Sequence, residues 1–401
     1  MKSHFILPIF LIVASLLFLS CSDEPSSLGI ELIGSDYILV RTYDSINDTI
    51  NQNSSYYKEV IPLGNSDWIL VGRYQSPEPP EQSIVASSLL KFIFGLADSL
   101  KTDIKADNIN VLDSWIELRN RYTYTDTLAT MNFSVYKVNS FWSSTSFTID
   151  SLSKLQYEMI DVSSDFLISD STYTFHIDED LPLSWMKNSA DNTLESNFGI
   201  YLEPTMTSNK VIGFQALTPL SSQAAKLTVV IEKPGVYVDT INGFISADIS
   251  LVDRPDFVPI LQDSLMYVQS SVSINSKLTF DIGILPAGLV INKAEIFITS
   301  DSINSVKGSI FNNNLRAFYL NSPDSTITEG NAISLSFKDN NYTGDITSFV
   351  RKWVSRNENF GILIEAGNPI LGLELFTLKG SDYSEISERP RLRITYTQQK
   401  N

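Results

Sequence analysis

Hydrophobic and polar residues alternate in short segments along most of this 401-residue chain. A period of two places one face of a strand on a core and the other in solvent, as in antiparallel sheets. The segments with this pattern are 87–94, 110–118, 131–138, 172–177, 226–232, 276–282, 293–299, 309–311, 332–337 and 391–396. Because polar turns separate these short strands, the pattern predicts an all-β fold of β-sandwich or jelly-roll type.

Two segments of the sequence are repeated later in the chain. Residues 197–203 (Asn-Phe-Gly-Ile-Tyr-Leu-Glu) are repeated as 359–365 (Asn-Phe-Gly-Ile-Leu-Ile-Glu), with an offset of 162. Upstream, the strand-like segment 88–95 matches 276–283 with an offset of 188. The larger upstream offset implies that the first unit, or its linker, contains extra residues.

These repeats predict two tandem β-sandwich or jelly-roll domains, 36–233 and 234–401. The boundary follows Lys233, because Pro234 and Gly235 break the strand pattern there.

Each predicted domain contains one short helical segment with a tryptophan. In the second domain, apolar residues at i, i+3, i+4 and i+7 form one stripe on a helix: Ile346, Phe349, Val350 and Trp353. Asp345 is placed to cap that helix, and in the first domain Pro182 fits the first turn after Asp180. We therefore expect Trp185 and Trp353 to be core residues rather than ligand platforms.

The only cysteine, Cys21, follows an apolar stretch at residues 5–19. About fifteen apolar residues are too few for a transmembrane anchor, which needs ~20, so the pattern favours a signal peptide over residues 1–20. Residues 18–21 resemble a lipobox, the site where bacterial lipoprotein signal peptidase cuts before an acylated cysteine. We therefore expect lipidation of Cys21 and a lipidated tether over residues 21–35.

The net charge of the chain limits the kinds of partner that it can bind. Without residues 1–20 the chain has 28 basic and 46 acidic side chains, a net charge of −18. This balance argues against nucleic-acid binding and against a polybasic membrane surface. Attachment to the outer membrane would then depend on the acyl chains of Cys21. Ser22-Asp23-Glu24 resembles the acidic export signal of Bacteroidetes-type lipoproteins, which implies display on the cell exterior; a solvated tether is the alternative.

Longer motifs point to a known module. The relevant segments are 276–282, 285–288, 291–298, 345–353, 359–362 and 388–396 in the second domain, with a looser counterpart in the first at 133–138, 141–142 and 147–148. Together they resemble the DNRLRE domain, a disaggregatase-related β-sandwich, in two tandem copies. The N-terminal part resembles an uncharacterised family of Bacteroidetes-type lipoproteins. Since DNRLRE domains are classed with carbohydrate-binding modules, the resemblance implies an alginate-like polysaccharide ligand.

Catalytic and metal chemistry have little support in the sequence. After residues 1–20, His176 is the only histidine, and no nucleophile elbow, zinc ligand set or phosphate-binding loop accompanies it. We therefore predict no enzymatic activity and no cofactor. Structural calcium is an open alternative at two oxygen-rich segments, 178–180 and 339–341 with Asp345, although solvated turns and helix caps explain them as well.

One local patch combines basic and aromatic side chains: Arg119, Arg121, Tyr122 and Tyr124. We expect them in one hairpin, where the tyrosines could stack on sugar rings and the arginines could bind uronate carboxylates. Ordinary edge-strand decoration is the alternative.

The sequence thus predicts a non-catalytic lipoprotein of the outer membrane that binds extracellular polysaccharide or mediates adhesion. The alternative is a structural or assembly protein of the cell envelope, which contacts other envelope proteins through exposed sheet edges. A glycan-cleaving enzyme with two facing carboxylates is a third hypothesis.

Overall fold

The computed structural model describes residues 38–48, 50–76, 83–125, 128–217, 224–257, 264–286, 288–322 and 328–399. The strands are β1 (Ile38–Asp44), β2 (Gln52–Lys58), β3 (Trp68–Gln75), β4 (Ser83–Phe94), β5 (Asn110–Tyr124), β6 (Phe133–Val138), β7 (Tyr157–Asp161), β8 (Ser163–Ser169), β9 (Thr172–Ile177), β10 (Ile200–Pro204), β11 (Val211–Gln215), β12 (Lys226–Lys233), β13 (Tyr237–Asp253), β14 (Leu265–Gln269), β15 (Ile274–Phe280), β16 (Val290–Thr299), β17 (Leu315–Leu320), β18 (Thr328–Lys338), β19 (Asn341–Asp345), β20 (Ile362–Ala366), β21 (Leu375–Lys379) and β22 (Arg391–Gln399). The helices are α2 (Asp98–Lys105), α3 (Asp180–Ala190) and α4 (Thr347–Arg356), with short 3₁₀ turns at Ile149–Lys154 and Ile386–Glu388. Antiparallel strands dominate the described residues, which confirms the predicted all-β fold.

Most of the alternating segments form strands. The segment 309–311 is an exception, because the strand there, β17, begins at Leu315. The helices also differ from expectation in one respect. The first domain has α2 in addition to α3, whereas we expected one helix per domain. The predicted apolar stripe of α4 is buried, as is Trp185 in α3, so both tryptophans are core residues as predicted.

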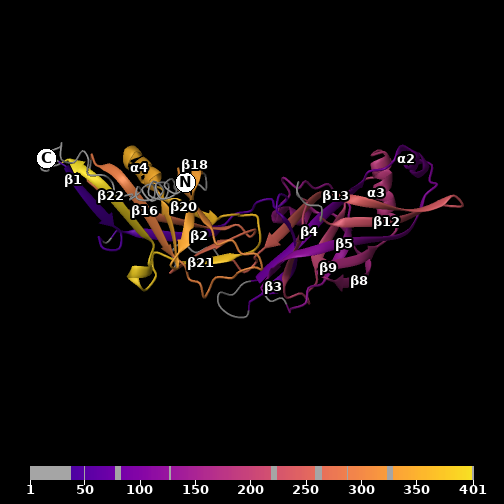
Figure 1. Ribbon diagram of the computed structural model, residues 1–401, viewed down its shortest axis with the longest axis horizontal. Coiled ribbons are helices and arrows are strands. Elements are labelled where there is room, and N and C mark those ends of the chain that lie inside the picture. The colour runs from indigo at the N-terminus through magenta and orange to yellow at the C-terminus, as the bar shows by residue number, and fades with distance from the viewer. Residues whose placement is uncertain are drawn as a thin grey trace, which may run out of the picture.

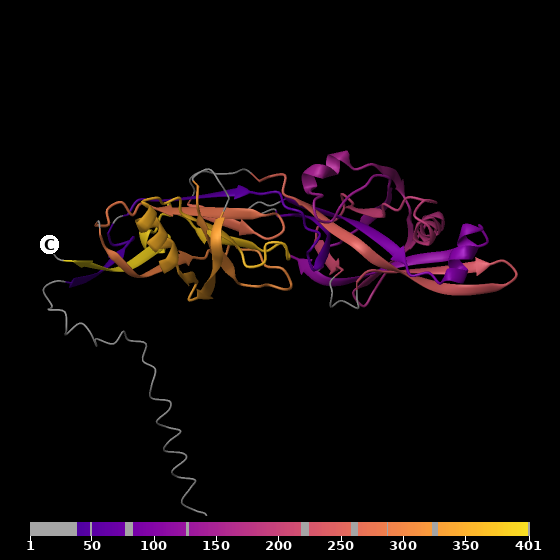
Figure 2. The same cartoon turned by 90° about the horizontal axis from the view of Figure 1, so that it is seen from above.

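Two lobes lie end to end along the long axis of the molecule (Figures 1 and 2). The lobe that we call the first domain contains β3–β13, whose pairings form a closed circuit in the order β13, β12, β5, β11, β3, β4 and back to β13. The second domain contains β1, β2 and β14–β22, and its two sheets are joined by β18, which pairs with β17 and then with β19. Each domain encloses its own hydrophobic core.

The strand pairings divide the chain differently from the predicted boundaries, 36–233 and 234–401. Strand β1 pairs with β22 and β2 pairs with β15, so the N-terminal strands complete the second domain. Conversely, β13 pairs with β12 and β4, so it completes the first domain. The first domain is therefore inserted in the chain between β2 and β14. The second domain takes β1 and β2 from before the predicted boundary, and the first domain takes β13 from after it.

An arginine motif near the C-terminus secures β1. Arg391 Nε donates to the carboxylate of Asp44 at 2.8 Å, and Arg393 Nε lies 3.5 Å from the same carboxylate. Burial opposes ionisation of Asp44, but the hydrogen bonds from Arg391 hold its pKa below the ordinary value. The Ser45 hydroxyl also accepts the amide hydrogen of Leu392 at 2.8 Å. Residues 391–393 thus anchor the strand that arrives from the start of the chain.

A further hydrophobic cluster joins the two domains. It combines Leu70 and Val211 of the first domain with Ile274 and Leu373 of the second. An ion pair also joins the last residues of β2 and β13: Lys58 Nζ lies 2.5 Å from Asp253 Oδ1. Since apolar side chains and an ion pair both bridge this contact, the domains are held in one arrangement.

A buried carboxyl group lies within this contact and makes stability depend on pH. Burial raises the pKa of Glu374 to about 7, from an ordinary value of 4.5. A raised carboxyl pKa means that folding favours the neutral form. The neutral carboxyl group of Glu374 therefore contributes fully to the stability of the fold below pH 4.5, and this contribution is lost as the pH rises through about 7.

We therefore expect the free energy of unfolding to fall by about 2–3 kcal/mol between pH 5 and pH 8 because of this group. Asp248, whose pKa is raised by burial to about 6, acts in the same direction within the first domain. Urea unfolding of Glu374→Gln should show a smaller fall, while the exposed control Glu195→Gln should match the unmodified chain. Equal pH slopes in all three proteins would contradict this role of Glu374.

Candidate ligand cavity in the second domain

The basic–aromatic patch predicted from the sequence is not a ligand platform. Residues 119–124 are the end of a single strand, β5, rather than a hairpin. The Arg119 and Arg121 side chains are exposed, but Tyr122 and Tyr124 are only 1% and 0% exposed. Both tyrosines belong to the cluster between the domains, so they offer no ring face to a sugar.

Hydrogen bonds explain why this end of β5 is buried. The Tyr122 hydroxyl accepts the amide hydrogen of Leu373, at 2.8 Å, from the second domain. The amide of Ser309 donates to Thr123 O at 2.8 Å, and the amide of Thr123 donates to Ser309 Oγ at 2.9 Å. The tyrosines therefore serve the contact between the domains.

The other sequence predictions lie elsewhere. Cys21 and the segments 1–20 and 21–35 are outside the described residues. Asp345 accepts the amide hydrogen of Thr347 at 2.9 Å, at the start of α4. Asp339 forms the turn between β18 and β19 with a positive φ of 49°. Within the described ranges, no group of three or more acidic, histidine or cysteine side chains is arranged to hold a metal ion.

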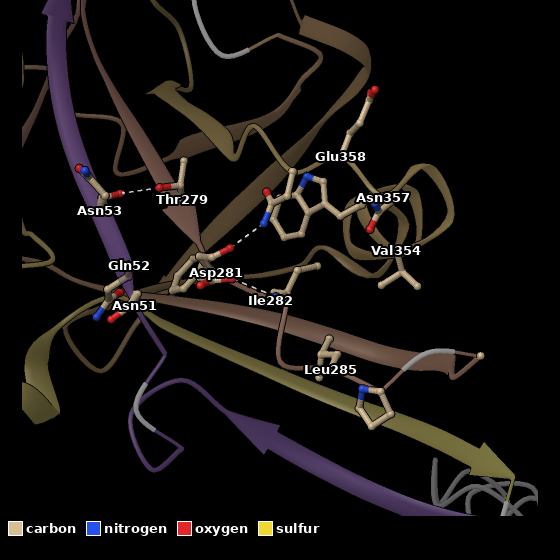
Figure 3. A pocket seen from close by; sticks show the side chains of 16 residues that line it. Asn51, Gln52, Asn53, Thr279, Asp281, Ile282, Leu285, Val354, Asn357 and Glu358 are labelled. Carbon is tan, nitrogen blue, oxygen red and sulfur yellow. Dashed lines mark hydrogen bonds between the residues drawn. The ribbon is translucent and has the colours of Figure 1, made fainter.

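A cavity of about 860 Å³ opens in the second domain (Figure 3). Three segments that are distant in the sequence form its wall: residues 51–53 at the start of β2, residues 279–286 and 288 at the end of β15 and beyond, and residues 353–359 at the end of α4. The cavity is therefore complete only when the N-terminal strand β2 pairs with β15.

In the first domain, an additional helix occupies the position equivalent to this cavity. There, the equivalent connection, between β4 and β5, contains α2, which packs Ile104 into the core beside α3. Ion pairs link the two helices, with Lys105 Nζ 3.1 Å from Asp191 and Lys187 Nζ 2.7 Å from Asp107. The described residues of the corresponding connection in the second domain, between β15 and β16, form no helix. The space beside α4 therefore stays open.

Local hydrogen bonds fix the wall of the cavity. Asn359 Nδ2 donates to Phe280 O at 2.6 Å, and its Oδ1 accepts the amide hydrogen of Gly361 at 3.0 Å. The carboxylate of Asp281 accepts the amide hydrogen of Gly283 at 2.9 Å. Asn357 ends α4 in the left-handed conformation, with a φ of 53°. These contacts preorganise the polar groups, which reduces the entropy lost on binding.

The side chains around the cavity form a mixed surface. Carboxamides are the most frequent polar groups, and these residues are Asn51, Gln52, Asn53, Asn357 and Asn359. Two carboxylates, Asp281 and Glu358, also line the cavity, and Leu285 and Val354 add apolar contacts (Figure 3).

Two buried polar atoms in these side chains have no hydrogen-bond partner among the described residues: Gln52 Oε1 and Trp353 Nε1. Trp353 is only 1% exposed, so its indole N–H cannot be satisfied by bulk water. Buried polar groups are normally paired, directly or through water. Both atoms lie beneath the surface of the cavity, since each is shielded from solvent in the structure.

The sequence contains only a weak signal for this cavity. The segments 276–288 and 359–362 match fold motifs, and no local pattern links them to residues 51–53. The unequal offsets of 188 and 162 did indicate additional residues in the first unit. Part of that addition is α2, which has no helical counterpart among the described residues between β15 and β16.

None of the helices in the described part of the chain has the length and hydrophobicity of a transmembrane span. Comparisons of the sequence with protein-family models and with curated proteins find no match.

Proposed function

We propose that this chain is a non-catalytic, lipid-anchored protein of the outer membrane that binds extracellular polysaccharide through the second-domain cavity. The cavity, with its carboxamides beside apolar side chains, is the observation that supports the proposal most. Carboxamides donate and accept hydrogen bonds, as sugar hydroxyls do, while apolar side chains suit the C–H faces of a sugar ring.

The arrangement of the termini suits display from a membrane. Ile38 lies opposite Gln399 at the outer end of the second domain (Figure 1). An acylated Cys21 would precede β1 by 17 residues, a tether of at most about 60 Å. The second domain would then lie nearer the membrane and the first domain farther from it.

Calorimetry of residues 22–401 with a panel of oligosaccharides tests the proposal. We expect saturable binding that is weakened roughly tenfold by Asn51→Ala or by Asn357→Gly, since each change removes one carboxamide. Glycine tolerates the left-handed conformation at position 357, so the end of α4 is preserved. The exposed Asn192→Ala is the matched control. No binding across the panel, or equal binding by all variants, would contradict the proposal.

One observation favours the alternative, an envelope assembly protein. Strand β8 pairs only with β9 among the described strands, and it exposes Phe166, Leu167 and Ile168 by 44%, 61% and 56%. An open, apolar strand edge is a site where another strand can add. Sedimentation at increasing protein concentration would distinguish this role, because glycan binding requires no self-association.

A further inference from the structure

The cavity is negatively charged. Among the described side chains that line it, Asp281 and Glu358 are charged and none is basic. Arg119 and Arg121, which the sequence suggested for uronate recognition, lie on β5 in the first domain. A carboxylate group of a ligand would thus meet like charges and no compensating cation.

Helix α4 adds to this negative potential. Its C-terminal end forms part of the cavity wall, and the amides of Asn357 and Glu358 both donate to one carbonyl, Trp353 O. The remaining terminal carbonyls carry the negative end of the helix dipole.

The basic residues of α4 are engaged outside the cavity. Lys352 Nζ lies 3.1 Å from Glu329, and Arg356 donates to the same carboxylate at 2.6 Å. Arg351 Nε donates to Ile291 O at 3.0 Å. These cations are therefore not available to neutralise an acidic ligand.

We propose that the cavity selects uncharged sugars and rejects uronates, in contrast to the alginate-like ligand that the family resemblance implied. This inference rests on the proposed glycan-binding function and specifies its ligand class. Repulsion from Asp281 and Glu358 should weaken uronate binding roughly tenfold at low ionic strength, and added salt should reduce the difference.

The test uses matched pairs of oligosaccharides whose sugar residues differ at C6 alone. The residues of the three pairs are mannose and mannuronate, glucose and glucuronate, and galactose and galacturonate. Calorimetry of residues 22–401 at two salt concentrations gives the affinity ratio for each pair. We expect the neutral member to bind at least tenfold more tightly, and the ratio to fall at high salt. In Asp281→Asn/Glu358→Gln the ratio should also fall, because both carboxylates become neutral amides.

The possible failures are distinguishable. Equal or tighter binding of a uronate would overturn the preference for neutral sugars and leave the glycan-binding function standing. A ratio that is unchanged in the double variant would also overturn it, since the carboxylates would then not be the cause. Absence of binding by every pair would remove the proposed function and this inference together.

Discussion

Replacing Gly199 by alanine should destabilise the first domain by about 3–5 kcal/mol. Gly199 has a φ of +77°, and an added Cβ would lie 1.9 Å from Leu90 O. That carbonyl belongs to β4, which pairs with β10 through Ile200 and Leu90. Because the atoms that the methyl group would meet belong to the backbone of Leu90, β4 and β10 must separate to admit it.

The second domain contains the same arrangement. Gly361 has a φ of +86°, and an added Cβ would lie 2.4 Å from Leu278 O. We expect Gly361→Ala to be destabilising by a similar amount, measured by urea unfolding. Gly95→Ala is the matched control, since its Cβ would meet no atom within 4 Å. A loss below 1 kcal/mol for both glycine variants would contradict this account of the repeat.

Truncating Tyr122 to alanine should lower the free energy of unfolding by about 3–5 kcal/mol, as expected for a buried aromatic side chain. The Tyr122 ring stacks on Trp68, with centroids 6.3 Å apart, and its hydroxyl accepts the Leu373 amide hydrogen. Tyr122→Phe keeps the ring and should lose about 1–3 kcal/mol, because that amide is left unpaired.

Arg121→Ala is the matched control for Tyr122→Ala. Its side chain is exposed on the same strand, so its removal should change stability by less than about 0.5 kcal/mol. If Tyr122 were instead a sugar platform, its truncation would reduce ligand affinity and leave unfolding unchanged. That result would contradict its placement between the domains.

The repeat in the sequence was informative because it follows strand pairing. Ile200 pairs with Leu90 in the first domain, and Ile362 pairs with Leu278 in the second. The offsets of 162 and 188 therefore describe the same pairing in both domains. Local alternation and glycine geometry, which the sequence records, determine this part of the fold.

Alternation alone could not place the tyrosines. The register of β5 is irregular, since Tyr122 and Asn120 pair with adjacent residues of β11. Leu118 packs in the core of the first domain, whereas Tyr122 and Tyr124 belong to the cluster between the domains. A strict period of two does not continue through such a bulge, so the local pattern does not show that the tyrosines are buried.

The exchange of strands between the domains could not be predicted in the same way. Strands β1 and β13 each pair with the last strand of a repeat, β22 or β12. Backbone hydrogen bonds do not distinguish one copy from the other, so the local pattern fits either partner. The cavity was missed for the same reason, since residues 51–53 reach it only through this exchange.

The most direct test of the account is a crystal structure of residues 22–401 with the oligosaccharide that binds most tightly. We predict sugar density in the second-domain cavity, between residues 51–53 and the end of α4, with hydroxyl groups bonded to the carboxamides of Asn51 and Asn357. Density on the exposed face of β5 at Arg119 and Arg121, with the cavity containing only water, would contradict the account.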